Sequence, residues 1–509
     1  MRGRHWVCAG LAALLLVLAG CQPIGGLDVP KLLLKQMEVT SYEGKQTVSI
    51  DIEAAKNEVP AEDAAALQMI DGAELTVDTK VQDDQRMSME GVFKAAGRQL
   101  PFRLGLKDRA VTAWIDGAAA PIIISEAADP SWGVSPLTTE DTRAIGRLAL
   151  ELFGKYAPNP SNISVKPVTE PVLGENLALK QVHLEFGGDE LLPWAKELLR
   201  AAMKDKEGLK QWFVSAGRLL YPAATGALDD MPLDQDVLPD VLNDGEAAGL
   251  SLYESFMEYA PELLAGLEQL EKDLPAYAPD AEALLGPATK LVMDLYADGE
   301  LNIRKSKLQL TIALPSSAGA PFSSITIRQT SEMGRLNEDV KADEMDMTNA
   351  VALDDPEMTP GKWLRHFEAG SLARQWLKQS GATARTASLL MPVPGADTTY
   401  DPYDMLQPYI KNGTLMVPLR HVAEQFDATL TWDSKTKLSL VDDITGAVTQ
   451  LELNSKKATV GGLEIDLPEA PELRDGQLYV PVRSVAFMLG LWLQKVEFYD
   501  STWIELIRK

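Results

Sequence analysis

A duplicated segment near the C-terminus restricts the fold of this chain more than any other feature of its sequence. The segment 413–420 (Gly-Thr-Leu-Met-Val-Pro-Leu-Arg) matches the segment 476–483 (Gly-Gln-Leu-Tyr-Val-Pro-Val-Arg) at an offset of 63 residues. An amphipathic stripe follows each copy and predicts a short helix that begins at Pro418 in the first copy and at Pro481 in the second. Strand-like alternation comes next in both copies. Each copy is therefore predicted to form a strand, a short helix and a strand pair.

The duplicated region resembles the copper amine oxidase N-terminal-like domain, or stalk domain, which is common in exported proteins of Gram-positive bacteria. The resemblance covers residues 401–509, and its motifs are Val-Pro-Leu-Arg at 417–420, Trp-Asp at 432–433 and Val-Pro-Val-Arg-Ser-Val-Ala at 480–486. The sequence departs from the family pattern at Asp427, where a glycine is usual. The resemblance implies a small duplicated α+β module with a binding or scaffolding role.

The family name does not imply an activity for this chain. Amine oxidase chemistry in that family requires copper bound by histidines and a quinone derived from a tyrosine in an Asn-Tyr-Asp/Glu motif. This chain has four dispersed histidines, no His-x-His pair and no Asn-Tyr dipeptide. Dispersed histidines are a poor copper site. We therefore expect no amine oxidase activity, no metal site and no cofactor.

Five residues of the repeat motifs are candidate functional residues, namely Pro418, Arg420, Trp432, Pro481 and Arg483. We expect them to be structural. A proline suits the first turn of a helix because its missing N–H would have no partner there. Each arginine is expected to pair with a carboxylate or to cap backbone carbonyls within its own unit. The alternative is that the two arginines bind an anionic wall polymer or a glycan.

The N-terminus predicts export and a lipid anchor. Residues 1–20 combine two early arginines with an apolar stretch at 7–19 that is too short to span a bilayer comfortably. The sequence Leu-Ala-Gly-Cys at 18–21 resembles the bacterial lipobox, in which the cysteine receives a diacylglyceryl group and becomes the first mature residue. Cys21 is the predicted lipidation site, and 21–31 is the predicted tether. The alternatives are an uncleaved anchor and a plain signal peptide.

This prediction places the protein at the extracellular face of the cytoplasmic membrane, held there by its lipid. The composition restricts the other partners. A net charge of −26 argues against nucleic acid, because phosphate binding requires clustered lysines and arginines. Two cysteines in 509 residues exclude a disulfide-rich scaffold and a zinc site made of cysteines alone.

Residues 32–356 are predicted to form a large α+β domain. Alternating apolar residues predict antiparallel strands from about residue 48 to residue 124, and helices follow. We predict a loop over 156–176, because it is rich in Pro and Asn, and a helix over about 280–297. Runs of strands followed by helices favour an antiparallel curved sheet with helices on one face. Residues 357–400 are predicted to be a linker with a helix around 363–377.

A curved sheet closed over helices is also the plan of bacterial lipoprotein carriers and lipid carriers. This similarity is one of architecture without a motif. It implies an apolar cavity, which Met87, Met89, Phe102 and Leu104 would line. The alternative is that these four residues are part of an ordinary core.

The sequence contains no motif of a known catalytic centre. The Gly-x-Ser-x-Gly elbow, the phosphate-binding Gly-x-x-x-x-Gly-Lys, the Gly-x-Gly-x-x-Gly loop and His-Glu-x-x-His are all absent. Our main hypothesis is therefore a non-enzymatic cell-surface lipoprotein with a binding or scaffolding role. One alternative is a carrier for a lipid or another amphiphile. The other is a cell-envelope hydrolase, whose carboxylate pair would be set in space and not by sequence spacing.

Overall fold

The computed structural model describes residues 27–54, 70–108, 110–125, 139–229, 244–277, 283–314, 322–355, 358–380, 387–395, 408–498 and 501–508. The chain forms two compact units. The first comprises residues 1–113 and 125–346, and the second comprises residues 114–124 and 347–509. Among the described residues, no helix is long and apolar enough to cross a membrane.

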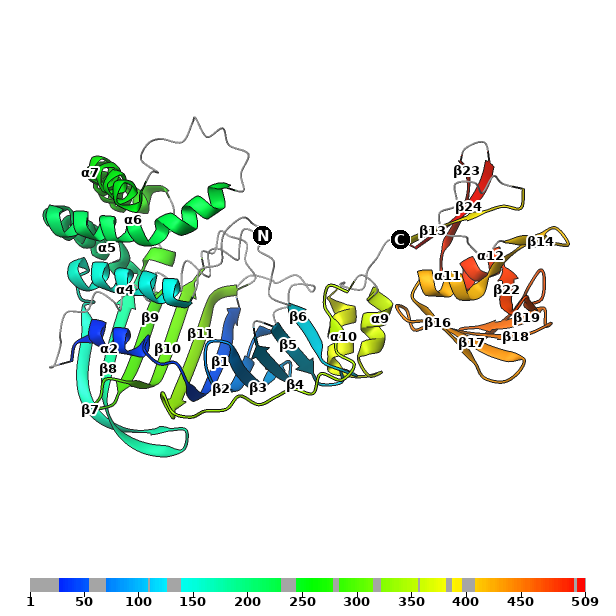
Figure 1. The fold of residues 1–509 in the computed structure, drawn as a ribbon, viewed down its shortest axis with the longest axis horizontal. Coiled ribbons are helices and arrows are strands. Elements are labelled where there is room, and N and C mark those ends of the chain that lie inside the picture. Colours follow the sequence, from blue (N-terminus) through cyan, green and yellow to red (C-terminus); the bar gives the residue numbers. More distant parts are fainter. Residues whose placement is uncertain are drawn as a thin grey trace. The chain divides into compact units, whose positions relative to one another are not determined.

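A large curved antiparallel sheet is the frame of the first unit (Figure 1). Its hydrogen-bonded strands run in the order β5-β4-β3-β2-β1-β11-β10-β9-β8-β7. The strands are β1 (Tyr42–Ala54), β2 (Ala73–Val81), β3 (Arg86–Ala95), β4 (Arg98–Lys107), β5 (Ala110–Ile115), β7 (Asn162–Val172), β8 (Glu175–Gly187), β9 (Lys290–Ala297), β10 (Ile303–Ala313) and β11 (Phe322–Gly334). The first strand pairs with the last, with Ile50 opposite Ile327. The sheet is therefore completed only when the two ends of the unit meet.

Strict alternation gives this sheet one apolar face and one polar face. On the apolar face, Leu184 lies opposite Met293 in the β8–β9 pair, and both side chains are buried. On the polar face, the neighbouring pair is His183 and Asp294. Burying one Leu or Met side chain contributes about 1.5–3 kcal/mol. The pattern that predicts the strands thus also selects the face that receives the helices.

Five helices lie on one side of this sheet (Figure 1). They are α2 (Val29–Gln36), α4 (Thr139–Tyr156), α5 (Gly188–Lys204), α6 (Lys206–Asp229) and α7 (Gly245–Tyr277). Val29 and Leu32 of α2 are fully buried against the apolar face of β8 and β9. The helices α6 and α7 approach each other closely, because a Cβ atom on Gly217 would lie 2.6 Å from the backbone nitrogen of Gly249. The predicted α+β class with helices on one sheet face is confirmed.

Two predictions in this unit are wrong. The predicted loop over 156–176 contains β7, whose Pro167 and Pro171 would interrupt a central strand. They are accommodated because β7 is the last strand of the sheet order and leaves one side of its backbone unpaired. The predicted helix over 280–297 contains β9, because Leu291, Met293 and Leu295 alternate towards the core instead of following a helical stripe.

The second unit contains the duplicated region and the segments that join it. Its remaining elements are β6 (Ile122–Ser125), β12 (Val351–Ala352), α9 (Pro360–His366), α10 (Leu372–Gln379), β13 (Ala387–Pro392), β14 (Tyr409–Lys411), β15 (Thr414–Pro418), α11 (Leu419–Gln425), β16 (Ala428–Trp432), β17 (Lys437–Asp442), β18 (Val448–Glu452), β19 (Lys457–Val460), β20 (Leu463–Asp466), β21 (Glu472–Arg474), β22 (Gln477–Pro481), α12 (Val482–Met488), β23 (Trp492–Phe498) and β24 (Ser501–Arg508). The strands from β13 to β24 form three small sheets, β13-β24-β23, β14-β15-β22-β21 and β16-β17-β18-β19-β20, and β6 pairs in parallel with β12.

The expected linker region carries regular elements of this unit. Two helices, α9 and α10, stand where one helix around 363–377 was predicted, and that prediction is wrong. The chain breaks between them at Gly370, which has a φ of +90°, and Ser371 then caps α10 by accepting a hydrogen bond from the backbone N–H of Arg374. Further on, β13 pairs with β24 along its whole length.

Candidate functional site

The two repeat copies are arranged around a local pseudo-two-fold axis. The strands β15 and β22 pair antiparallel, and Val417 lies directly opposite its own repeat equivalent, Val480. A tight hairpin precedes each strand. Its corner residues are Asn412 and Gly413 in the first copy and Asp475 and Gly476 in the second, and all four have positive φ. Asn-Gly and Asp-Gly are the preferred pairs for such a turn. The repeat therefore folds twice by the same local rules.

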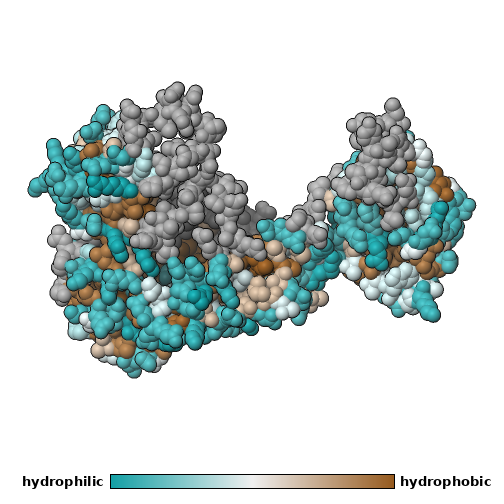
Figure 2. All heavy atoms as spheres, in the orientation of Figure 1, coloured by the Kyte–Doolittle hydropathy of each residue, from teal (hydrophilic) through white to brown (hydrophobic). Residues whose placement is uncertain are grey.

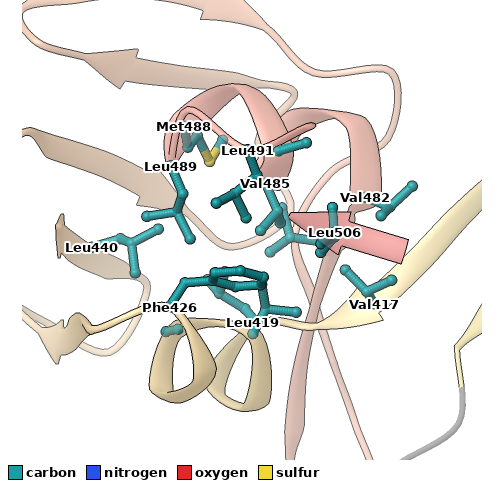
Figure 3. Close-up of a cluster of buried hydrophobic side chains, with 14 of the residues drawn as sticks. Val417, Leu419, Phe426, Leu440, Val482, Val485, Met488, Leu489, Leu491 and Leu506 are labelled. Carbon is teal, nitrogen blue, oxygen red and sulfur yellow. The ribbon is translucent and has the colours of Figure 1, made fainter. Parts of the chain in front are cut away.

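The helices α11 and α12 bury their apolar stripes against each other and against the strands (Figure 3). Leu419 and Phe426 at the two ends of α11 face Val485 of α12, and all three are at most 1 % exposed. Leu506 of β24 is also fully buried in this core. The predicted order of strand, short helix and strand pair is confirmed in both copies.

The motif prolines mark the transition from strand to helix in each copy. Pro418 is the residue before α11 and Pro481 the residue before α12. Both are buried, and each ends a strand of the central pair. A fixed φ and a missing N–H suit this transition. Their geometry is that of structural residues.

The motif arginines have a different environment. Arg420 and Arg483 each follow the first residue of a short helix, and both side chains are exposed. Within the described residues, no ion pair or hydrogen bond is formed by either guanidinium. Trp432, the remaining motif residue, ends β16 with 38 % of its surface exposed. These three motif residues therefore present two equivalent cations and one aromatic ring to solvent.

The departure from the family pattern at Asp427 has a structural reason. Asp427 has a φ of +51°, and its repeat equivalent Gly490 has a φ of +60°. Both positions follow the short helix and adopt the left-handed conformation, which glycine tolerates best and Asp tolerates better than most residues. The Asp427 carboxylate accepts a hydrogen bond from the Thr359 hydroxyl at the start of α9. The packing is close, because a Cβ atom on Gly361 would lie 2.4 Å from that of Asp427.

A second contact joins α9 to the strand pair β16–β17, which follows Asp427. Arg365 forms an ion pair with Asp443, and its guanidinium lies 3.1 Å from the Thr429 hydroxyl. Burial raises the pKa of Asp443, and the hydrogen bond from Thr429 and the charge of Arg365 oppose that rise. The Thr429 hydroxyl is 2.9 Å from the same carboxylate. Residues far apart in sequence thus hold α9 on the first repeat copy.

A buried ion pair joins the two copies. Arg508, at the end of β24, donates to both carboxylate oxygens of Asp442, at the end of the equivalent strand β17, at 3.2 and 2.8 Å. The side chains are 13 % and 2 % exposed. Such two-point pairing satisfies both buried groups. Sequence reasoning did not identify this pair, because nothing near either residue indicates its partner.

A polar cluster lies on the central four-stranded sheet of the module. The Tyr409 hydroxyl donates to Glu472, and Lys411 forms an ion pair with the same carboxylate. Burial, followed by the hydrogen bond and charge of Glu472, raises the pKa of Tyr409. Hydrogen bonds from Lys411 and Tyr409 lower the pKa of Glu472. Arg474 lies 4.6 Å from the centre of the Tyr409 ring. Lys411 and Tyr409 therefore both hold the Glu472 carboxylate in place.

The polar face of the large sheet carries a similar network. Lys305 is buried and lies 2.9 Å from Glu332, and its ammonium donates to the Pro171 carbonyl at 2.8 Å. Nearby, His183 lies between Asp294, at 2.7 Å, and Glu185, at 3.2 Å. Burial lowers the pKa of His183, but the hydrogen bonds and charges of these two carboxylates outweigh it and raise the pKa above its ordinary value.

The candidate cavity residues lie together on the apolar face of the large sheet. Met89 is opposite Leu104 in the β3–β4 pair, Met87 lies two residues before Met89 on the same strand, and Phe102 is opposite Gly91. All four side chains are half-buried. None of them belongs to the buried cluster that packs β8 and β9 against α2.

Two further sequence predictions concern residues that lie wholly or partly outside the described ones. Cys21 lies outside them, and so does most of the predicted tether, whose residues Val29 to Lys31 form the first turn of α2. Within the described residues, no group of three or more His, Cys, Asp and Glu side chains is arranged to hold a metal ion.

The comparison with protein families supports the reading of the C-terminal module. The model of the copper amine oxidase N-terminal domain matches residues 399–497. No curated protein matches the chain. The matched domain is a non-catalytic, stalk-type part of that enzyme family, so the match carries no amine oxidase chemistry. It covers about a fifth of the chain, and all of the matched residues belong to the second unit.

Proposed function

We propose that this chain is a non-enzymatic lipoprotein of the bacterial cell surface, held by a lipid on Cys21. The C-terminal module serves as its scaffolding part, and the α+β unit serves as its recognition part. The export signal with its lipobox-like ending supports the anchor. The match to a non-catalytic stalk-type domain supports the scaffolding role.

The observation that carries the scaffolding role is that some repeat residues are buried and structural whereas others are exposed. The apolar residues of the motif pack in the core, and the prolines precede the helices. Arg420 and Arg483 are left exposed at equivalent positions. Two cations repeated on one rigid module suit a repetitive anionic polymer of the cell wall. The module then binds through charge without needing a catalytic group.

Fractionation of producing cells tests the anchor. We expect Cys21→Ala to lose incorporation of labelled fatty acid and to pass into the medium or to accumulate unprocessed. Cys8→Ala is the matched control, because it changes the other cysteine within the same predicted signal peptide and should leave labelling and retention unchanged. Labelled, membrane-retained Cys21→Ala protein would disprove the anchor.

Sedimentation with purified anionic wall polymer tests the scaffolding role. The double variant Arg420→Gln/Arg483→Gln should bind at least severalfold more weakly at low salt, because two exposed charges are lost. The control Lys435→Gln/Lys457→Gln removes the same charge elsewhere on the module and should bind nearly as well as the parent. Equal binding by both double variants would show that the arginines have no special role.

A second candidate function is that the α+β unit binds an amphiphile. The half-buried apolar residues on β3 and β4 favour it, because a continuous apolar sheet face outside the main buried cluster suits a hydrocarbon chain. Native mass spectrometry of the purified chain should then detect a bound lipid that organic extraction removes. A ligand-free mass after gentle purification from the producing cells would count against this function.

A further inference from the structure

The helical block of the first unit contains an apolar pocket that no sequence motif indicates. Its volume is about 240 Å³, and apolar side chains of α4, α5, α6 and α7 line it. Leu209 and Ala202 are buried parts of the lining, whereas Leu263 of α7 is 55 % exposed. Figure 2 shows hydrophobic side chains between the hydrophilic ones over this block. The pocket therefore opens to solvent beside Leu263.

Two ion pairs link α5 to α7 next to the pocket lining, since Arg200 follows the lining residue Leu199 and Glu268 follows the lining residue Leu267. Lys196 pairs with Glu271, and Arg200 lies 2.6 Å from Glu268. Lys196 is buried, and the residue before it, Ala195, lines the pocket. These four charged side chains, which we call the rim, form two pairs of opposite charge.

An exposed apolar row on α7 leads to the same opening. Its members are Leu252, Tyr259, Leu263 and Leu270, whose spacing of seven, four and seven residues places them on one side of the helix. Only Leu263 of this row lines the pocket. Such a row beside a pocket mouth is suited to guiding a hydrocarbon chain inward.

We propose that this pocket binds the single hydrocarbon chain of an amphiphile whose head group is net neutral and carries hydroxyls. This proposal rests on the amphiphile-binding function of the α+β unit, and it places the hydrocarbon chain in the helical pocket instead of on the face of β3 and β4. An apolar cavity of about 150 Å³ stays dry and admits benzene, so a pocket of about 240 Å³ has room for part of an alkyl chain.

The rim determines the class of head group. A charged head would have to separate a rim ion pair and leave one charge without its partner, which is costly where Lys196 is buried. A hydroxyl donates to a carboxylate and accepts from a guanidinium, so it can join the Arg200–Glu268 pair without breaking it. Charge balance at the rim therefore favours a neutral hydroxylated head.

Titration calorimetry of the purified full chain with 1-monolauroylglycerol, below its critical micelle concentration, tests the pocket. Leu263→Ser should weaken binding about tenfold, because apolar contact with the chain is lost and a hydroxyl is placed at the mouth. Leu220→Ser is the matched control, since Leu220 is 43 % exposed on the neighbouring helix α6, is not part of the row on α7 and does not line the pocket. It should bind as the parent does.

Two further comparisons complete the experiment. Ala195→Phe, with folding checked by circular dichroism, should fill the pocket and weaken binding as Leu263→Ser does. Lauric acid and dodecylamine, which have the same chain length but charged heads, should bind about tenfold more weakly than the neutral probe. Equal binding of all three amphiphiles would overturn the assignment of the head group.

The outcomes separate this proposal from the function beneath it. If the parent binds the neutral amphiphile and both Leu263→Ser and Ala195→Phe bind it equally well, the pocket assignment is overturned and amphiphile binding stands. If the parent binds none of the three amphiphiles, both fail. Weakening by the two pocket variants, with Leu220→Ser unchanged, supports the pocket.

Discussion

The two units of the molecule reach their folds by opposite routes. The C-terminal module contains the same short motif twice, namely a hairpin turn, a strand, a proline and a helix. Its core forms where the two copies meet at Val417 and Val480. The first unit depends on one wide sheet whose first and last strands must find each other, as Ile50 and Ile327 do. The difference shows that the fold of a duplicated module can be predicted from local sequence. In a sheet that depends on the pairing of distant strands, local sequence does not predict how the helices cover the sheet or where pockets form.

The largest predicted effects test whether the two units are stabilised separately. Phe426→Ala removes a fully buried side chain of the module, and Leu184→Ala removes one from the large sheet. Each should cost about 3–5 kcal/mol of unfolding free energy. Hydrogen exchange read by mass spectrometry should show lost protection only in the unit that carries the change. Phe487→Ala, at a side chain that is 64 % exposed, is the control and should cost little.

This comparison can be broken directly. If Phe426→Ala reduced protection in β8 and β9 as much as in the module, the chain would unfold as one cooperative body. The contrast between two routes of folding would then have no energetic meaning.

The next effect concerns the ion pair that joins the two copies. Arg508→Met should destabilise the module by about 3 kcal/mol, because it leaves the buried Asp442 carboxylate without its partner. Lys457→Met breaks an exposed ion pair with Glu464 in the same module and should cost much less, because water screens that pair. Denaturant unfolding measures both. Equal costs would mean that burial does not distinguish the two pairs.

A smaller effect tests the equivalence of Asp427 and Gly490. Gly490→Ala should cost about 1–2 kcal/mol, because its φ of +60° is unfavourable for a residue with a Cβ atom. Gly266→Ala is the control, since that helical glycine has open space around a Cβ atom and the change should be neutral or stabilising. Thermal unfolding reports both changes. A stabilising Gly490→Ala would show that the left-handed requirement is absent.

The smallest effect concerns pH and belongs to the first unit. The pKa of His183 is raised in the folded protein, so its protonated form stabilises the fold below the unfolded pKa of about 6.5. That contribution is lost as pH rises through the folded pKa. His183→Gln should therefore lower stability more at pH 5.5 than at pH 9, as denaturant unfolding at the two values would measure. A difference from the parent that is the same at both pH values would contradict it.

The sequence predicted the strands and short helices of the module well, because each depends on turn residues, prolines and stripes within ten positions. The prediction from sequence failed where contacts with residues distant in the chain decide the structure. The prolines of β7 predict a loop, although an edge position in the sheet accommodates them in a strand. The strand β13 was placed in a linker, although it pairs with β24 more than a hundred residues later. The Asp442–Arg508 pair and the pocket at Leu263 had no local signal at all.

The sequence by itself determined the alternation that separates the apolar from the polar face of the large sheet, and the duplicated motif that builds the module. These are properties of period and backbone preference, which a chain carries at each position. Only the tertiary structure decided that Asp427 holds α9 through Thr359, that Arg508 satisfies Asp442, and that four helices leave an apolar pocket between them. Contacts between distant residues depend on how packed elements share space, and no local pattern encodes that arrangement.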